Sequence, residues 1–286
     1  MYLTKHKYTG ATYESGSALP MVEQYVIPGF KPTSQLTDAE IVAIQTILQG
    51  RQPFSLYFSA AIKELSRGLD NRSFCVKDGD GVVMAIDFDE LRVISVIGKI
   101  DDDILPNLVS NGRRSELHVT EELADKLSRL GAGRLARRNT LRYYQLRKSD
   151  LFEVDSRNLR RLSLDQLDIV KRFYAENYDG AIFSNWMLAM PFYGLFVEGE
   201  LASAGGCVVM DETERAANIG NFLTTPRYRG KGLAKQVTKT LLNNLITSGI
   251  ASFTLGTTEE NVPAWRAYES VGFSLLEKRI ELEFLP

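Results

Sequence analysis

The chain has 286 residues, enough for one large domain or two ordinary ones. Hydrophobic residues make up 44% and charged residues 24%, with a net charge of −2 and a mean hydropathy of −0.15. These values exclude a collagen-like, disordered or membrane-spanning chain. Two distant cysteines, Cys75 and Cys207, and two histidines, His6 and His118, predict neither a disulfide framework nor a metal site. The N-terminus lacks the apolar stretch of a secretory signal, which predicts a cytoplasmic protein that binds no membrane.

The charge is unevenly distributed. Residues 113–148 hold ten Lys/Arg and four Asp/Glu, a balance of +6, which leaves −8 for the rest of the chain. Such a stretch can bind a polyanion, or it can be the solvated side of a helix and a hairpin. No aromatic residues suited to base stacking interleave with it before Tyr143 and Tyr144, which favours the solvated face and argues against a nucleic-acid partner.

The first half of the chain predicts a hairpin-rich unit. Residues 1–50 form an irregular arm that leads into a helix over 38–49, where Thr37 and Glu40 have capping-box spacing. A second helix is expected over 54–69. The elements expected after it are strands over 74–77, 82–88, 91–96 and 117–119, turns at 78–81 and 89–90, a helix with Leu123, Leu127 and Leu130 that ends at Gly131, and a strand over 141–146.

From about residue 152 the order of elements begins again. Expected in turn are a helix around 164–173, a short helix over 186–190, a hairpin over 192–210 and a strand over 218–225 that Pro226 ends. A long helix from about Gly230 to Gly249 carries apolar residues at four-residue spacing, and it is followed by a strand (252–255), a helix (262–271) and a final strand (280–284). The shared order predicts two copies of one fold, over 51–150 and 151–286, after an N-terminal segment over 1–50.

The strongest chemical signal is the strand-to-helix turn Leu223-Thr224-Thr225-Pro226-Arg227-Tyr228-Arg229-Gly230-Lys231-Gly232-Leu233-Ala234. A glycine-rich turn at the start of a helix exposes successive backbone N–H groups at the positive end of the helix dipole, which is suited to a phosphate. Its glycines can also serve the backbone alone. Neither the P-loop pattern nor the dinucleotide fingerprint fits this segment.

A second segment runs from Asn261 through Tyr268 to Gly272-Phe273, starting 31 positions after Gly230. With these two segments, residues 152–286 resemble the Gcn5-related N-acetyltransferase (GNAT) family: Arg227-x-x-Gly230-x-Gly232 matches its pyrophosphate motif, and the Asn261 segment matches its other cofactor motif. The resemblance implies an α/β fold of the α+β type, with a mixed, mostly antiparallel sheet that is splayed between the strands at 218–225 and 252–255 and flanked by helices. Acetyl-CoA would lie in that cleft as the cosubstrate.

The resemblance and the chemistry of the residues together give the candidate site. Tyr268 is the candidate acid that protonates the leaving thiolate, a backbone N–H near Leu223 is the candidate oxyanion donor, and Asn221 or Asn218 is expected to order a water. Arg227, Arg229 and Lys231 would supply partial countercharge. The cofactor-binding residues expected are Phe222, Leu223, Thr224, Thr225, Arg227, Arg229, Gly230, Lys231, Gly232, Leu233, Ala234, Asn261, Ala264 and Tyr268.

The acceptor side is less determined by the sequence. Carboxylates that could act as general base through water are Asp211, Glu212, Glu214, Glu259 and Glu260, although the sequence favours a solvated charge for each of them. Aromatic residues that could line an acceptor pocket, or simply form core, are Tyr174, Tyr178, Phe183, Trp186, Phe192 and Tyr193. The acceptor is expected to be a small primary amine, and a homodimer is compatible with the sequence.

The first half departs from the family pattern. Its loop 100–112 contains no Arg-x-x-Gly-x-Gly, and Leu127 stands four residues before Gly131, where Tyr268 stands before Gly272. We therefore expect a degenerate copy that shapes the acceptor site, a layout similar to that of glycine acyltransferase-like proteins. The predicted function is transfer of an acetyl group from acetyl-CoA to a primary amine by direct attack; the alternative is a non-catalytic module that binds acyl-CoA as an effector.

Overall fold

The computed structural model describes residues 27, 29–66, 73–87, 91–110, 112–131, 133–177 and 183–286. Most of the expected N-terminal arm, the turn at 89–90 and Tyr178 lie outside these residues. The first long helix begins as predicted: the Thr37 hydroxyl accepts a hydrogen bond from the Glu40 amide at 3.3 Å, and the Glu40 carboxylate accepts one from the Thr37 amide at 2.8 Å.

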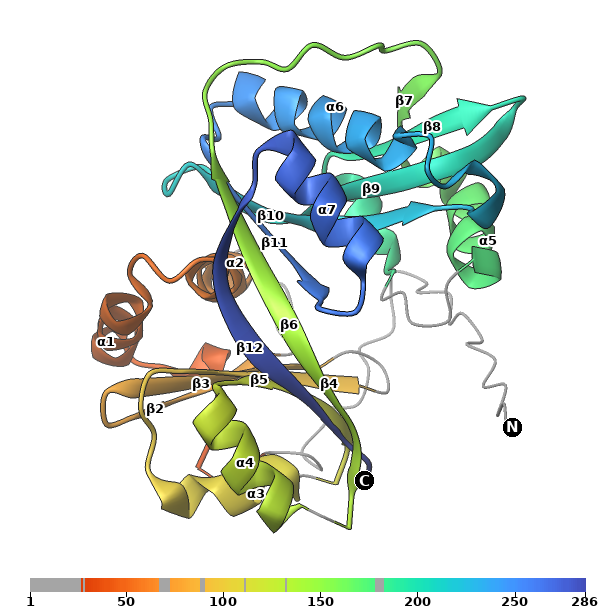
Figure 1. The fold of residues 1–286 in the computed structure, drawn as a ribbon. Helices are drawn as coiled ribbons and strands as arrows, with labels where there is room; N and C mark the ends of the chain where they lie inside the picture. Colours follow the sequence, from red (N-terminus) through yellow and green to blue (C-terminus); the bar gives the residue numbers. More distant parts are fainter. Residues whose placement is uncertain are drawn as a thin grey trace.

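The strands of the described residues join one twelve-stranded sheet in the order β1-β2-β3-β4-β5-β12-β6-β11-β10-β9-β8-β7 (Figure 1). The first-half elements are β1 (Lys31–Pro32), α1 (Asp38–Leu48), α2 (Phe54–Ser66), β2 (Ser73–Asp78), β3 (Gly81–Asp87), β4 (Leu91–Ile97), α3 (Leu105–Val109), β5 (Arg114–Val119), α4 (Glu121–Leu130) and β6 (Leu135–Arg147). The second-half elements are β7 (Leu159–Arg161), α5 (Leu167–Asn177), β8 (Phe192–Val197), β9 (Glu200–Asp211), β10 (Ala216–Thr224), α6 (Leu233–Thr247), β11 (Ser252–Thr258), α7 (Val262–Val271) and β12 (Ser274–Phe284). Short 3-10 turns are η2 (Thr33–Gln35), η3 (Asp102–Ile104), η4 (Leu164–Gln166), η5 (Asn185–Ala189) and η6 (Pro226–Tyr228).

Each half contains one parallel strand pair, and all other pairs are antiparallel. This mixed, mostly antiparallel sheet flanked by helices confirms the predicted fold class. In the first half β4 and β5 stay paired over five residues, from Leu91 opposite Arg114 to Ser95 opposite His118. In the second half β10 and β11 pair over only three, from Ala216 opposite Ser252 to Asn218 opposite Thr254.

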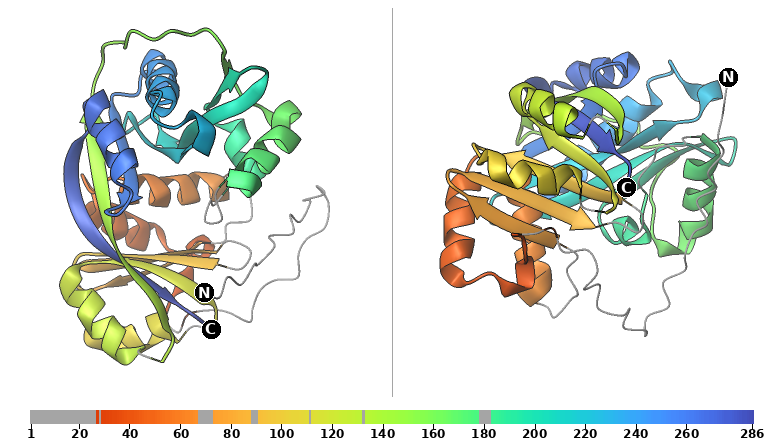
Figure 2. Two further views of the ribbon diagram at one scale, coloured as in Figure 1. Left: turned by 45° about the vertical axis from the view of Figure 1, so that its right-hand side comes forward. Right: turned by 90° about the horizontal axis from the view of Figure 1, so that it is seen from below.

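The two halves exchange strands. β6, which ends the first half, pairs with β11 of the second half from Leu141 to Arg147. In return β12, which ends the second half, pairs with β5 of the first half from Ile280 to Phe284. Both strands are longer than the sequence pattern indicates, and Figure 2 shows them crossing from one half to the other. The boundary near residue 150 thus falls in a connection, but the strand before it completes the second half's sheet.

Two helices cover each face of the second half. α6 and α7 pack on one face through Leu241, Leu245, Tyr268 and Val271, against strand residues that include Phe253 and Leu255. The opposite face is covered by α5 of the same half and by α2 of the first half. Within the described residues, no helix is both long enough and apolar enough to cross a membrane.

Polar contacts fix α2 to the second half. Lys63 Nζ lies 2.9 Å from the Asp211 carboxylate, which also accepts a hydrogen bond from the Ser59 hydroxyl. Ser55 Oγ donates to Glu214 at 3.0 Å. The first half therefore contributes a helix as well as a strand to the framework around the candidate site.

Candidate active site

β10 and β11 diverge at the centre of the second half. Their pairing ends at Asn218 and Thr254, beyond which β11 pairs only with β6. β10 continues beside β9 through a bulge between Gly220 and Leu223, where Asn221 adopts φ 56°. A bulge increases local twist and turns the strand away from its neighbour. Residues 219–224 of β10 consequently have an edge that no strand covers.

The turn after β10 forms a set of unpaired amides. Gly230 (φ 75°) and Gly232 (φ 74°) adopt left-handed backbone conformations that favour glycine, and a Cβ at either would meet nothing within 4 Å. The first hydrogen bond of α6 runs from the Gln236 amide to the Gly232 carbonyl at 3.2 Å. Among the described residues, no group accepts a hydrogen bond from the amides of residues 230–235, which we call the 230–235 amides. They combine unsatisfied donors with a helix dipole, the requirement for binding a phosphate.

A buried hydroxyl beside these amides also lacks a partner. Thr225 Oγ1 is shielded from solvent and makes no hydrogen bond in the part of the chain that the structure describes. Buried polar atoms are normally paired, and an orphan indicates a ligand or a water that completes the site. The turn thus fits an anionic cofactor on two independent observations.

The three expected cations lie at this turn but are already engaged. Arg227 forms an ion pair with Glu200 and donates to Tyr228 Oη at 2.7 Å. Arg229 Nε donates to the Thr224 carbonyl at 3.1 Å. Lys231 Nζ lies 5.1 Å from the centre of the Tyr228 ring. They provide positive potential near the amides, which Glu200 partly cancels.

The main-chain N–H and C=O groups of successive residues in β10 point to opposite sides of the strand. Leu223 lies opposite Ala204 of β9, and its carbonyl accepts a hydrogen bond from Ser203 Oγ at 3.1 Å. The Thr224 carbonyl accepts instead from Arg229, on the side away from β9. Because successive residues of a strand direct their main-chain groups to opposite sides, the Leu223 N–H points toward β9. The oxyanion donor expected near Leu223 stays a prediction, and a neighbouring residue of β10 is the candidate for it.

Phe222 is the better-placed donor. The Asn221 carbonyl accepts a hydrogen bond from Tyr174 Oη at 2.5 Å, which directs it toward α5. In a planar trans peptide the N–H of the next residue points the opposite way. The Phe222 amide is thus directed away from α5.

Tyr268 lies on α7 with its ring packed between three others. The ring centroids of Phe222, Tyr144 and Phe273 lie 6.0, 6.3 and 6.3 Å away. Burial raises the pKa of Tyr268, so its hydroxyl is protonated at neutral pH. That hydroxyl has no hydrogen-bond partner among the described residues, yet it is not one of the polar atoms sealed from solvent. A protonated donor beside β10 is what a general acid requires.

Asn261 and Ala264 begin α7. Asn261 is the exposed N-cap, and its side chain makes no capping hydrogen bond, so its amide group is available. Ala264 is half-buried, and its amide is bonded to the Asn261 carbonyl at 3.0 Å. Both stand on the same helix as Tyr268.

The polar residues on β10 differ from each other. Asn218 is buried; its Nδ2 donates to the Thr254 carbonyl and hydroxyl, each at 3.1 Å, and its Oδ1 accepts from Tyr57 of α2 at 2.9 Å. It is a structural junction, and the expected water-ordering role does not fit it. Asn221 Nδ2 faces Met187 Sδ at 3.0 Å.

Three of the carboxylates expected as general bases already accept hydrogen bonds from neighbouring side chains. Burial would raise the pKa of Asp211, but hydrogen bonds from Ser59 and Lys63 lower it to about 2. Glu214 accepts from Ser55. A hydrogen bond from Lys278 lowers the pKa of Glu259, which Arg142 also contacts. Asp211 is thus a buried anchor for α2 rather than a solvated charge, and Glu212 and Glu260 are exposed.

Most of the expected pocket aromatics are core. Tyr174 stacks on Phe183 at 5.1 Å, and both contact Phe192 edge-on. Tyr193 is half-buried against the cluster under α6, whereas Trp186 is 49% exposed. These rings support the strands at the divergence instead of lining an open pocket.

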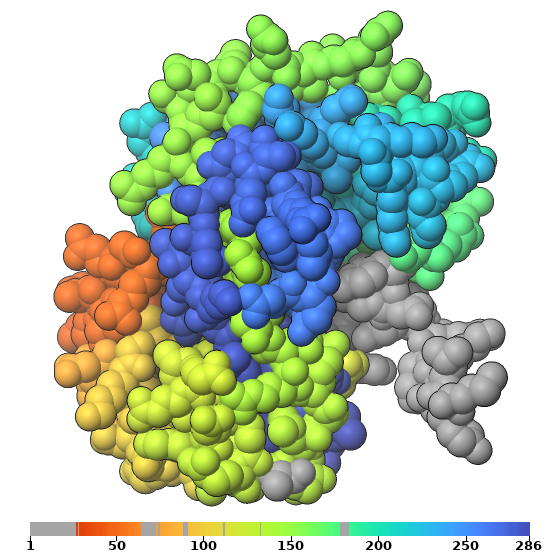
Figure 3. Space-filling model, viewed as in Figure 1, coloured from red at the N-terminus to blue at the C-terminus, as the bar shows by residue number. Residues whose placement is uncertain are grey.

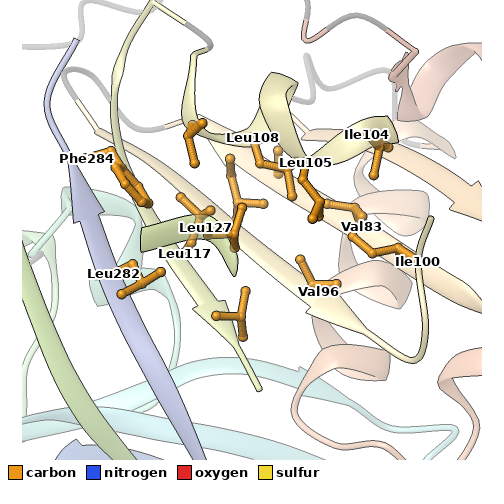
Figure 4. Close-up of a cluster of buried hydrophobic side chains, with 14 of the residues drawn as sticks. Val83, Val96, Ile100, Ile104, Leu105, Leu108, Leu117, Leu127, Leu282 and Phe284 are labelled. Atoms are coloured by element: carbon orange, nitrogen blue, oxygen red, sulfur yellow. The ribbon is translucent and has the colours of Figure 1, made fainter. Parts of the chain in front are cut away.

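The corresponding region of the first half is filled. Ile100, Ile104, Leu105 and Leu108 are buried in one hydrophobic cluster that also contains Leu127 (Figure 4). The helix at this place, α3, has five residues against fifteen in α6. Three successive aspartates, 101–103, precede it and would repel a diphosphate.

The basic stretch is largely neutralised. Arg114, Arg137 and Arg138 pair with carboxylates of β12, β5 and α4, and Arg142 pairs with Glu259. This pairing fits the solvated face better than a polyanion-binding surface.

Sequence reasoning missed the residues that the first half brings to the site: Tyr57, Arg142 and Tyr144. Tyr57 bonds Asn218, and Tyr144 contacts Tyr268. For Arg142 and Tyr144, the only signal in the sequence was the aromatic pair Tyr143-Tyr144 within a basic strand, and this pair does not indicate which strand would lie beside it. Tyr57 lies in the predicted helix over 54–69 and carried no such signal.

The family comparison agrees with the geometry. Residues 157–273 match the model of the acetyltransferase (GNAT) family. No curated protein matched the sequence significantly.

Several solved structures share the fold of most of the chain. A Drosophila protein has 12% identity and a TM-score of 0.69, over 90% of this chain and 99% of its own. A GCN5-related N-acetyltransferase-like protein from Streptococcus suis has 15% identity and a TM-score of 0.58, over 86% and 99%. A tandem GNAT protein from the clavulanic acid biosynthesis pathway has 11% identity and a TM-score of 0.51, over 74% and 81%. At these identities the likeness concerns the fold.

Proposed function

We propose that the protein transfers an acetyl group from acetyl-CoA to a primary amine by direct attack within a ternary complex. The observation that carries this proposal is the pairing of an anion-binding turn, the 230–235 amides, with a protonated Tyr268 hydroxyl across the divergence of β10 and β11. The GNAT match over residues 157–273 supports an acyl-CoA-dependent acetyltransferase at the level of the family.

Each part of the cofactor has candidate partners in this chain. The 230–235 amides and the Thr225 hydroxyl would hold the diphosphate, with Arg227, Arg229 and Lys231 nearby. The uncovered edge of β10 and the Asn261 amide would bind the pantetheine amides, as an added strand binds a sheet edge. Acetyl-CoA itself supplies the activated thioester.

The amine loses one proton to solvent water before it attacks the thioester and a second one as the amide forms, and two groups of the protein assist the reaction. The carbonyl oxygen gains negative charge as the amine attacks, and the Phe222 N–H is placed to stabilise it. The departing sulfur needs a proton, which Tyr268 donates. No metal takes part in this proposal.

The first half is, in our proposal, a degenerate copy of the same fold that serves the second half as a scaffold. It repeats the parallel pair and the helix after it, but the cofactor region is filled by Ile100, Ile104 and Leu105. The buried free thiols of Cys75 and Cys207 suit a reducing compartment such as the cytoplasm.

Two measurements on the full chain test the function. Thiol release from acetyl-CoA is followed with a panel of amines comprising glycine, glutamine, spermidine and an aminoglycoside, and binding of acetyl-CoA and CoA is measured by calorimetry. Binding with amine-dependent thiol release supports the transferase. Binding without release from any amine contradicts it and supports a regulatory module that holds acyl-CoA as an effector.

A further inference from the structure

Strand β6 of the first half supports the helix that carries Tyr268. Two side chains on the same face of β6, Arg142 and Tyr144, reach α7 and the turn before it. Figure 3 shows atoms of β6 in a narrow strip between the blue segments of α7 and β12. The second half therefore does not position its own candidate acid alone.

Arg142 contacts three groups around α7. Its Nη1 donates to Glu259 Oε1 at 3.3 Å, and its Nη2 lies 3.7 Å from Glu269 Oε1. Its guanidinium lies 4.7 Å from the centre of the Trp265 ring. Glu259 precedes the helix, and Trp265 and Glu269 are four residues apart, so these contacts span the helix from its start to near its end.

Tyr144 links this cluster to the candidate acid. Arg142 Nε donates to Tyr144 Oη at 2.8 Å, and Tyr144 Oη donates to Glu269 at 3.1 Å. The Tyr144 ring is fully buried and contacts the Tyr268 ring edge-on at 6.3 Å. A displacement of Arg142 would therefore be transmitted to Tyr268 through one packed ring.

The chemistry of the cluster needs arginine. The Arg142 side chain is 16% exposed and uses three nitrogens on three partners while its plane faces an indole. A planar guanidinium can do this, whereas a lysine ammonium offers one centre and does not stack in the same way. This makes Arg142 different from Arg138 of the same strand, which pairs only with the exposed carboxylates of Glu121 and Asp125.

Building on the transferase function, we propose that Arg142 is a positioning residue for the reaction: it fixes α7 so that the Tyr268 hydroxyl faces the departing sulfur. None of the contacts of Arg142 given above is with the cofactor turn, because the 230–235 amides lie in the turn before α6 and in its first residues. Its loss is expected to lower turnover and to spare coenzyme A binding.

The kinetic test combines Arg142 with Tyr268. Arg142→Gln should lower kcat about tenfold with the fastest amine of the panel, and change the Kd for CoA less than about threefold. In a Tyr268→Phe background the same substitution should lower kcat by less than about twofold, because the group it positions is already gone. Arg142→Lys should restore part of the lost rate.

The matched control is Arg138→Gln. Arg138 lies on the same strand, but it pairs with Glu121 and Asp125 of α4 and does not contact α7. Its replacement removes the same charge and should leave kcat unchanged.

A second readout does not depend on turnover. The chain has two tryptophans, so in a Trp186→Phe background Trp265 reports alone on α7. Arg142→Gln should shift the Trp265 emission to longer wavelength as water reaches the exposed ring face, and Arg138→Gln should not.

The outcomes separate this inference from the transferase function. Unchanged Trp265 emission, or kcat losses from Arg142→Gln and Tyr268→Phe that simply multiply, would overturn the positioning role. If the wild-type chain releases no thiol with any amine, the transferase proposal fails. Whether Arg142 fixes the position of α7 is then decided by the Trp265 emission alone.

Discussion

Tyr268 is the residue on which the chemistry depends most directly. We expect Tyr268→Phe to lower kcat by roughly ten- to a hundredfold, since the variant keeps the ring but loses the proton donor. The Kd for CoA should stay within about twofold, because the diphosphate turn lies on another helix. Steady-state kinetics and calorimetry measure the two effects; an unchanged kcat would remove the acid role.

Gly232 tests the proposed diphosphate site at the 230–235 amides, because one φ angle there favours glycine. A side chain at φ 74° costs about 1–2 kcal/mol, so Gly232→Ala should distort the turn and weaken CoA binding about tenfold. Gly249 is the control because it also has positive φ (91°), but it follows the far end of α6. Gly249→Ala should lower the melting temperature and leave the Kd for CoA unchanged. Equal weakening of CoA binding by both variants would contradict a diphosphate site at the 230–235 amides.

At the scale of elements, a buried charge cluster joins β5, β12 and β6. His118 Nε2 lies 3.0 Å from Glu116 and 3.8 Å from Glu281, and His118 Nδ1 lies 3.2 Å from Tyr143 Oη. Arg137 contacts both glutamates. Burial alone would lower the pKa of His118, but the hydrogen bonds to the two glutamates raise it to about 9.

This cluster should make the exchanged strands sensitive to pH. A pKa that rises from 6.5 to about 9 on folding contributes roughly 3 kcal/mol below pH 6.5 and loses that contribution as the pH rises through 9. We expect the difference in unfolding free energy between wild type and His118→Gln to be largest below pH 6.5 and to shrink toward pH 9. Urea titrations across this range measure it, and a difference that does not change with pH would refute the assignment.

The sequence predicted most elements because their signals are local. The Thr37–Glu40 capping box, the glycines at 230 and 232 and the apolar spacing of α6 depend on neighbouring residues only. Asp211 was expected to be solvated because its partners, Ser59 and Lys63, are some 150 positions away. The bulge at Asn221, which sets the alternation of β10, is likewise not visible in the sequence.

At the scale of the molecule, the exchange of β6 and β12 joins two similar halves into one sheet. The choice of partner strand could not be predicted, because a strand's own residues specify its faces but not which of two similar neighbours it will join. The expected division at residue 150 has a consequence for design: a fragment of residues 150–286 lacks β6, which lies between β11 and β12.

We expect the full chain to unfold as one cooperative unit. Neither half can lose its fold without removing a strand from the other, so calorimetry should show a single transition whose van 't Hoff and calorimetric enthalpies agree. A 150–286 fragment should fail to give a folded spectrum. Two resolved transitions in the full chain, or a stable fragment, would show that the exchanged strands do not couple the halves.

The most direct test of the central claim is a titration of the amide-labelled full chain with coenzyme A, followed by nuclear magnetic resonance. We expect the amide signals of Gly230, Lys231, Gly232 and Leu233 to move by far the most, and pantetheine, which lacks the diphosphate, to leave them in place. Amide signals of residues 230–235 that stay unmoved at millimolar coenzyme A would contradict the proposed diphosphate site, and with it the transferase.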